Sequence, residues 1–319
     1  MTEFGLGFRS DKRPGDYARL AVAAEDSGFD VLSVFGDLMD QPPIFPLLEM
    51  AAVTTRVRLG AACWNPYTQH PYEIGGQFAA LDLASGGRAY LGLARGSWLG
   101  QIGVGQPAPL QHLREATGFI RALLAGEPYA GRVFRLAPGT HLNYRPQRTD
   151  VPVLIGTWGA RTAALAGEIA DEVKIGGTAN PAVVGVMRDR IGTPHVGIVV
   201  GAVTVVDEDG SRARARARTE VAKYVAVVAG LDPTLDLPED LMPALQNRIA
   251  QGDEAGAGEL IPRNLLSRFA FAGTPEEVAE QARALIAAGA GRVEFGPPHG
   301  LADDHGVHLL GSRVLPLLR

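Results

Sequence analysis

Short apolar segments alternate along the chain with longer segments in which apolar residues recur every three or four positions. The short segments are rich in Val, Ile, Leu and Gly, as buried parallel strands are, and the longer ones have the period of crossover helices. Eight strands are predicted on this pattern, over residues 4–8, 30–35, 57–63, 89–94, 151–156, 172–175, 196–206 and 292–296. Eight strands that alternate with helices predict an α/β fold of the (β/α)8 TIM barrel type.

The clearest helix start precedes the last of these strands. Thr274, Pro275 and Glu277 form a capping box with proline at the first helical position. Apolar residues then recur on one face, and Gly289 stands where a left-handed helix end is expected. This segment predicts the helix that leads into the last strand.

Three stretches exceed what a minimal barrel needs, namely residues 98–110, 129–150 and 230–270. The second has Pro138 and Gly139 between two short apolar runs and predicts a hairpin between strands four and five. The third, with several prolines and a glycine-rich part, predicts a loose helical excursion after the seventh strand. Such insertions lie at the C-terminal mouth of a barrel, so we expect one barrel domain over residues 1–319 with insertions at its mouth.

Charge and composition narrow the partners and the compartment. The chain is 46% hydrophobic, and 30 Lys and Arg stand against 35 Asp and Glu, for a net charge near −5. This balance gives no general attraction to nucleic acid or to anionic membranes, so we expect neither as a partner. The single cysteine, the lack of a signal-peptide pattern and the absence of a long apolar run favour a reducing, cytoplasmic location. Four arginines at alternate positions from 212 to 218 are interpreted as a solvated helix face.

The candidate chemistry lies where strands end, because barrel enzymes carry their working residues there. Four junctions stand out, at residues 60–71, 91–98, 156–162 and 175–181. The last two are glycine-rich turns that open helices, which can offer free N–H groups and a positive dipole end to a phosphate. The alternative is that these glycines only close tight turns, and the sequence leaves both open. No HExxH or GxSxG motif occurs and a lone cysteine excludes a thiolate zinc cluster, so no metal is expected.

Four segments carry a resemblance to a known family. They are Asn-Pro-Tyr-Thr at 65–68, Leu-Asp-Leu-Ala-Ser-Gly-Gly-Arg at 81–88, Ala-Gly-Glu-Ile-Ala-Asp-Glu at 166–172 and Gly-Thr-Pro-Glu at 273–276. With these segments in this order, the sequence resembles the luciferase-like flavin and deazaflavin oxidoreductases from end to end, and most closely the methylenetetrahydromethanopterin reductases.

The resemblance implies a barrel that holds a tricyclic ring over its C-terminal mouth. It also implies a non-prolyl cis peptide between Ala62 and Cys63 that backs the ring, and an acid, Asp37, at the end of the second strand. The phosphate of the cofactor tail would be received by Gly156, Gly159, Ala160, Gly176, Gly177 and Thr178. The rest of the implied cofactor shell is Ala61, Ala62, Cys63, Trp64, Asn65, Ala94, Gly96, Ser97 and Trp158, together with Asp37.

Two departures from the family bear on the reaction. Leu38 follows Asp37 where relatives often have histidine, and Ser97 stands where the methylene reductases have an acid. A serine hydroxyl cannot serve as an acid near neutral pH, so the tetrahydromethanopterin substrate is not expected to carry over. Asp37, and solvent acting through Ser97, are the candidate proton donors. Other interpretations stay open: Asp37 as an acceptor for the following loop, and Cys63 as a small space-filling side chain.

The function that the resemblance implies is hydride transfer between reduced coenzyme F420, a deazaflavin, and a small organic substrate. One alternative is an FMN-dependent monooxygenase of the same fold. Another, of a different class, is a non-catalytic relative that only binds flavin. A homodimer is expected from the resemblance alone.

Overall fold

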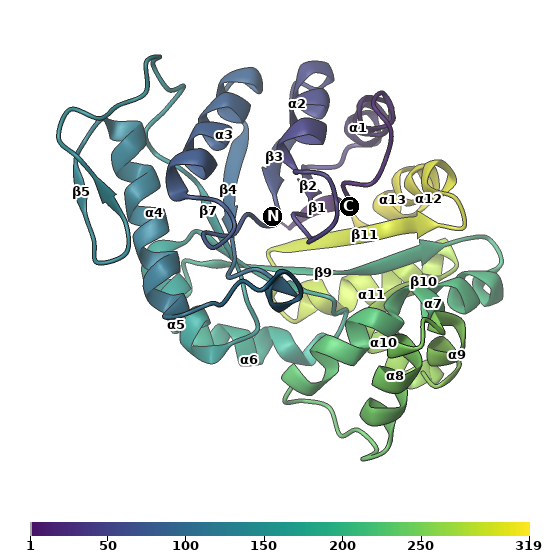
Figure 1. Cartoon of the computed structure of the whole chain (residues 1–319). Helices are drawn as coiled ribbons and strands as arrows, with labels where there is room; N and C mark the ends of the chain where they lie inside the picture. Colours follow the sequence, from purple (N-terminus) through teal and green to yellow (C-terminus); the bar gives the residue numbers. More distant parts are fainter. Residues whose placement is uncertain (1) are drawn as a thin grey trace.

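A closed ring of parallel strands forms the centre of the molecule (Figure 1), whose computed structural model describes residues 2–319. The ring strands are β1 (Glu3–Phe8), β2 (Val31–Val34), β3 (Arg58–Ala61), β4 (Ala89–Leu93), β7 (Val153–Gly156), β8 (Glu172–Gly176), β9 (Gly197–Val206) and β11 (Arg292–Gly300). Each pairs in parallel with the next, and the β8–β9, β9–β11 and β11–β1 pairings close the ring. The predicted (β/α)8 barrel is therefore confirmed.

Helices cover the outside of the ring and follow the strands in turn. They are α1 (Asp16–Asp26), α2 (Ile44–Val53), α3 (Pro71–Ala84), α4 (Pro109–Ala125), α5 (Ala160–Ile169), α6 (Ala182–Ile191), α7 (Gly210–Val228), α11 (Pro275–Ala287), α12 (Asp303–Leu309) and α13 (Leu315–Leu318). The predicted capping box starts α11: Thr274 accepts from the Glu277 N–H, and the Glu277 carboxylate accepts from the Thr274 N–H. The main core lies between the strands and these helices. None of the described helices is long and apolar enough to cross a membrane.

The insertions follow the prediction with one difference. The hairpin forms from β5 (Tyr129–Ala130) and β6 (Arg135–Leu136), and the excursion forms α8 (Leu241–Ala250), α9 (Glu254–Glu259) and α10 (Arg263–Phe269). The excursion is helical, as predicted, and it leads directly into a short strand that the pattern did not predict, β10 (Ala270–Gly273). This strand pairs with the last four residues of β9, outside the ring. The hairpin and the α8–α10 segment lie on opposite sides of the molecule (Figure 1).

The arginine-rich segment from 212 to 218 lies in α7, as predicted. Ala213 and Ala217 are buried against the second core, which joins α7 to β10 and the α8–α10 segment. Arg216 pairs along the helix with Glu220 at 2.6 Å, and Arg214 pairs with Glu277 at 2.6 Å. Ala213 and Ala217, one helical turn apart, are thus buried, while Arg212 and Arg216 are exposed and Arg214 and Arg218 are partly buried.

Candidate active site

Alternate residues of each strand face the barrel axis, and those nearest the mouth are mostly glycine. Lys174, Tyr90 and Glu294 face inward, because they contact one another or Ser33 across the barrel. The period of two then places a glycine at the next inward position toward the mouth on four strands. These residues are Gly92 on β4, Gly156 on β7, Gly176 on β8 and Gly296 on β11. Four strands therefore present backbone to the upper layer of the barrel, and the Phe35 ring and the Cys63 sulfur are among the side chains that share this layer with them.

The predicted acid, Asp37, stands just beyond the end of β2. Burial raises the pKa of its carboxyl to about 6, and the carboxylate of Asp40 adds to this, while Arg9 and Lys174 oppose it. Within residues 2–319, no N–H or O–H group donates to the Asp37 carboxylate, so it does not cap the loop that follows. The burial of the nearby Tyr224 phenol, together with the Asp37 charge, raises the pKa of Tyr224 to about 12. Asp37 is thus an acid that can hold or release a proton near pH 6.

The third strand ends in the cis peptide bond, Ala62–Cys63, that the family resemblance implied. Backbone hydrogen bonds hold the bond on both sides: the Ala62 N–H donates to Val34 at 2.8 Å and the Trp64 N–H donates to Gly92 at 2.9 Å. A Cβ atom at Gly156 would lie 3.0 Å from the Cys63 sulfur, so the thiol faces the barrel interior. Burial raises the pKa of the Cys63 thiol to about 12, which keeps it protonated and inert near neutral pH. This fits the space-filling interpretation of Cys63.

The residues after Cys63 shape the loop. Trp64 is buried, and its indole N–H has no partner among the described residues. The Asn65 side-chain oxygen accepts from the N–H groups of Tyr67 at 3.2 Å and Thr68 at 2.9 Å, which fixes the turn. A Cβ atom at Gly96 would lie 3.0 Å from Asn65 Cγ. Asn65 therefore holds its own loop, and Gly96 lets the next one approach.

The fourth-strand loop carries two predicted site residues with different surroundings. Ala94 continues the ladder, since its N–H donates to the Trp64 carbonyl at 2.9 Å. Ser97 lies beyond it and is exposed, as is Trp98. The serine residue is therefore exposed to solvent, unlike the half-buried acid Asp37.

The two glycine-rich turns differ in what they can offer an anion. At the start of α5, the Gly159 N–H donates to the Thr157 hydroxyl at 3.0 Å, and Trp158 Nε1 donates to the Gly176 carbonyl at 2.9 Å. The first N–H groups of the helix, from Ala160 on, have no acceptor among the described residues. The helix start, with its dipole, is therefore open to an anion.

The turn after β8 is already paired internally. The N–H groups of Gly177 and Thr178 both donate to the Gly201 carbonyl, at 2.8 and 3.2 Å. The Thr178 hydroxyl donates to the Arg268 carbonyl at 3.1 Å and is fully buried. Strand β9 and helix α10 thus occupy the groups that the sequence assigned to phosphate binding, and only the α5 turn keeps free donors.

A layer of charged and polar side chains below the glycines was missed by the sequence reasoning. Ser33 on β2, Tyr90 on β4, Lys174 on β8 and Glu294 on β11 form one hydrogen-bonded group inside the barrel. Four side chains from alternate strands make up one layer of a TIM barrel, and branched apolar residues usually fill it. The one sequence feature that could have indicated this layer is the presence of a lysine and a glutamate inside otherwise apolar strand segments.

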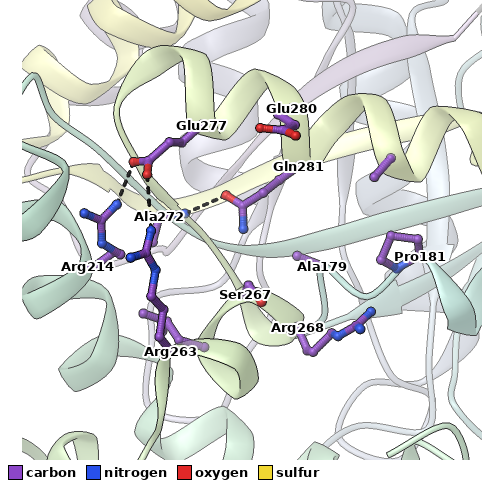
Figure 2. A pocket seen from close by; sticks show the side chains of 12 residues that line it. Ala179, Pro181, Arg214, Arg263, Ser267, Arg268, Ala272, Glu277, Glu280 and Gln281 are labelled. Carbon is purple, nitrogen blue, oxygen red and sulfur yellow. Dashed lines mark hydrogen bonds and ion pairs between the residues drawn. The ribbon is translucent and has the colours of Figure 1, made fainter.

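A cavity of about 340 Å³ lies between α10, α11 and β10, outside the ring of strands (Figure 2). Residues of α7, α10, α11 and β10, and of the segment just before α6, line it. Its charged groups are largely paired: Glu277 holds Arg214 at 2.6 Å and Arg263 at 3.5 Å, and Gln281 bonds the β10 backbone. These contacts attach α11 to the excursion, which is a structural role.

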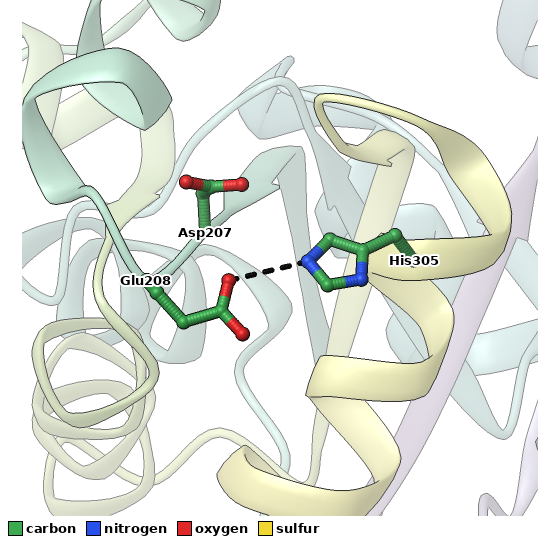
Figure 3. A group of neighbouring side chains, drawn as sticks. All are labelled: Asp207, Glu208 and His305. Carbon is green, nitrogen blue, oxygen red and sulfur yellow. Dashed lines mark hydrogen bonds and ion pairs between the residues drawn. The ribbon is translucent and has the colours of Figure 1, made fainter.

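Asp207, Glu208 and His305 bring ligand-type atoms within 4.8 Å of one another (Figure 3). Protein contacts explain this group without an ion. His305 Nε2 bonds Glu208 at 3.2 Å, and the Asp207 carboxylate accepts from the Asp209 N–H at 3.0 Å. Glu208 and His305 are both exposed, so the pair joins the end of β9 to α12 across the surface.

Fold and site together define an α/β barrel with its candidate groups at the carboxyl ends of the strands, where barrel enzymes carry their active sites. The luciferase-like monooxygenase family model matches residues 2–292, and the chain belongs to this family. It is 31% identical, over 99% of its length and 100% of the relative's, to the 5,10-methylenetetrahydromethanopterin reductase of Archaeoglobus fulgidus. It is 28% identical to the F420-dependent glucose-6-phosphate dehydrogenase of Nakamurella multipartita, over 96% of this chain and 93% of that one.

Solved structures show the same fold. The coenzyme F420 dependent tetrahydromethanopterin reductase from Methanopyrus kandleri superposes with a TM-score of 0.88 at 24% identity, over 100% of this chain and 99% of that one. An F420-dependent secondary alcohol dehydrogenase, in complex with an F420-acetone adduct, superposes with a TM-score of 0.79 at 18% identity, over 100% and 99%. These likenesses extend over the whole barrel and its insertions.

Proposed function

We propose that the protein is a coenzyme F420-dependent oxidoreductase that transfers a hydride between the coenzyme and a small organic substrate. The observation that carries this proposal is the end-to-end match to relatives named as F420-dependent enzymes or as methylenetetrahydromethanopterin reductases. The hydride chemistry belongs to the coenzyme when it is bound, and the protein binds, orients and shields the reactants.

The residues at the mouth fit a planar ring with an anionic tail. Glycines line the upper layer, and a Cβ atom at Gly176 would meet nothing within 4 Å, so a flat ligand can approach the backbone there. The Ala62–Cys63 bulge offers a backbone wall on one side of this space. The free N–H groups at the start of α5, from Ala160 on, are the donors for a phosphate in the tail. Gly177 and Thr178 would shape the turn rather than bind the phosphate, because their donors are already used.

Asp37 is the residue that would supply or take up a proton. Its half-buried carboxyl has a pKa of about 6, so it is partly protonated under mildly acidic conditions, unlike an ordinary aspartate. Ser97 is exposed and cannot act as an acid itself, so its hydroxyl would orient water or substrate. With no acid at position 97, the substrate is proposed to be smaller than a tetrahydropterin and to need only one acid, Asp37.

A binding titration tests the proposal directly. Purified apo protein is titrated with coenzyme F420 and, separately, with FMN, and the visible absorbance of each is followed. Micromolar binding of F420 with much weaker binding of FMN is expected, followed by oxidation of reduced F420 when a suitable carbonyl, alkene or imine is added. Micromolar FMN binding without F420 binding would contradict the proposal, and oxygen uptake with reduced FMN would then identify a monooxygenase. Stoichiometric F420 binding with no turnover across the substrate panel would instead indicate a non-catalytic coenzyme carrier.

A further inference from the structure

A tyrosine on helix α7 stands at the mouth of the barrel. A Cβ atom placed on Gly177 would lie 3.8 Å from Tyr224 Cβ and 3.4 Å from Val228 Cγ2. Gly177 belongs to the turn that follows β8, and β8 ends at the mouth with Gly176. The C-terminal half of α7 therefore packs against the mouth, and it brings Tyr224 to a place that the predicted site did not include.

The Tyr224 phenol extends from this turn toward the loops that follow β1 and β2. Burial raises its pKa to about 12, and the carboxylates of Asp37 and Asp40 add to this, while the Arg9 charge opposes it. Asp37 has the largest effect of these three charges. The phenol is therefore close to the candidate acid, and it stays a neutral hydrogen-bond donor near neutral pH.

Neither side chain of this pair is engaged by the protein. In the part of the chain that the structure describes, the Tyr224 hydroxyl makes no hydrogen bond, and no group donates to the Asp37 carboxyl. Both residues are half-buried, so both polar groups are partly withdrawn from water. Polar groups in such surroundings usually have a hydrogen-bond partner. A ligand at the mouth that carries a suitable polar atom would satisfy both groups at once.

The charges around Asp37 indicate what kind of ligand this is. The two cations that act on Asp37 are Arg9 and Lys174. Arg9 pairs with Asp40 at 3.1 Å, and Lys174 pairs with a glutamate deeper in the barrel. Neither cation is free to bind an acidic group of a substrate. Met39, two positions after Asp37, is apolar and 77% exposed. These surroundings favour an uncharged substrate with an apolar body.

We propose that Tyr224 is a substrate-binding residue, whose hydroxyl donates a hydrogen bond to the reacting oxygen of an uncharged ketone or aldehyde, or of the corresponding alcohol. Asp37 contacts the same oxygen. A carbonyl oxygen has two lone pairs and accepts from both groups, whereas an imine nitrogen has only one. This inference rests on the proposed function and deepens it, because it names the substrate class and adds a residue to the site.

The two residues have different tasks in the reaction. In the reducing direction, the carbonyl carbon receives the hydride that reduced F420 supplies and the oxygen takes the Asp37 proton, so C=O becomes CH–OH. The coenzyme is oxidised and releases its second hydrogen to solvent as a proton, while Asp37 regains a proton from solvent. Tyr224 keeps its proton and stabilises the negative charge that develops on the oxygen. Alcohol oxidation is the reverse, with the Asp37 carboxylate as the base.

The first test measures binding without turnover. Isobutyramide presents a carbonyl oxygen that is not reduced, and its affinity for the protein loaded with reduced F420 is measured by isothermal titration. Tyr224→Phe is expected to weaken amide binding about tenfold, through the loss of one hydrogen bond, and to leave F420 affinity unchanged. Tyr129→Phe is the matched control, because Tyr129 is also half-buried but lies in the hairpin insertion. It is expected to change neither affinity.

The second test measures turnover. The wild-type protein is expected to reduce uncharged ketones or aldehydes with reduced F420, and to reduce 2-oxo acids and imines poorly. Tyr224→Phe is expected to lower kcat/KM for the carbonyl substrate by about tenfold to a hundredfold, whereas Tyr129→Phe keeps the wild-type value. In both variants kcat/KM for reduction should still fall as the pH rises through about 6, because Asp37 still supplies the proton.

The outcomes separate this inference from the proposed function. No uptake of F420, or uptake without turnover of any substrate, contradicts the proposed function, and the inference falls with it. Turnover confined to imines or to 2-oxo acids leaves the proposed function in place and overturns the inference. A Tyr224→Phe protein with the amide affinity and kcat/KM of the wild type also overturns it. If that variant does not fold, Tyr224→Leu is measured instead, and the wild-type substrate panel decides the substrate class without any variant.

Discussion

Asp37→Asn is expected to stabilise the apo protein, and to do so only where the carboxyl is ionised. Burial raises the pKa of Asp37 from its ordinary 3.8 to about 6 in the folded protein. The folded state therefore binds this proton more tightly than the unfolded chain, and ionisation costs folding free energy as the pH rises from 3.8 through 6. Asparagine has nearly the same shape and stays neutral, so the variant avoids this cost.

The size of the effect follows from the two pKa values. Their difference of about 2.2 units corresponds to about 3 kcal/mol of unfolding free energy once the carboxyl is fully ionised, at pH 8. At pH 4.5 the same values give about 1 kcal/mol, and below pH 3.8 the difference vanishes. The stabilisation by Asp37→Asn should thus grow as the pH rises. The same replacement of an ion-paired aspartate would instead destabilise the protein increasingly as the pH rises.

The assay is urea unfolding of wild type and variant at pH 4.5 and pH 8, followed by circular dichroism. Asp26→Asn is the matched control, because Asp26 is exposed at the end of α1, and its replacement should change stability by less than about 0.5 kcal/mol at either pH. A destabilised Asp37→Asn protein, or one whose advantage does not depend on pH, would show that the carboxyl is not held in a desolvated site. The assignment of Asp37 as the proton donor would then lose its physical basis.

Three further predictions concern the mouth and one insertion. Gly176→Val should weaken F420 binding at least about tenfold by isothermal titration, because its new Cβ enters free space at the mouth, whereas Gly185→Ala on the exposed face of α6 should leave binding unchanged. Native Cys63 is only partly exposed, and desolvation raises its thiol pKa to about 12. It should therefore react with a disulfide reagent at pH 8 more than about tenfold more slowly than the urea-unfolded chain, and equal rates would show that the thiol is not shielded. The Glu115 carboxylate accepts hydrogen bonds from the N–H groups of residues 132, 133 and 134 at 3.0, 2.7 and 3.0 Å. Glu115→Gln should therefore destabilise the hairpin insertion by about 2 kcal/mol at pH 7. Faster proteolysis within residues 129–136 would report this loss. The Glu115 effect should shrink as the pH falls toward the lowered pKa of about 2, where the wild-type carboxylate is itself protonated, and a pH-independent loss would point to packing instead.

The eight ring strands could be predicted because each is a local pattern. A short apolar run bounded by glycine or proline is buried whatever its neighbours are, so its existence does not depend on the rest of the fold. The short strand β10 lacks that independence. Its residues, Ala270–Gly273, form a strand because β9 continues past the end of its pairing with β8 and offers backbone groups on that side. The local sequence of these four residues does not indicate that they pair with a strand more than sixty positions earlier in the chain.

Some features of the candidate site could likewise be predicted from the sequence, and others depended on the tertiary structure. The sequence alone located four strand ends and the two glycine turns, because position after a strand determines position at the mouth, whereas Asp37 was implied by the family resemblance. Tertiary structure decided which of those groups have free donors: the long β9 carries Gly201 to the Gly177 and Thr178 amides, while the α5 turn meets no such strand. It also brought together Ser33 and Glu294, which lie 261 positions apart.

Residues along a strand that is buried on both faces read as one apolar run, so the sequence cannot say which of them point into the barrel. Lys174 therefore appeared as an isolated charge in an apolar strand. Closing the ring decided its direction and gave it Glu294 as a partner, because inward positions of alternate strands share one layer only after the first and last strands have met.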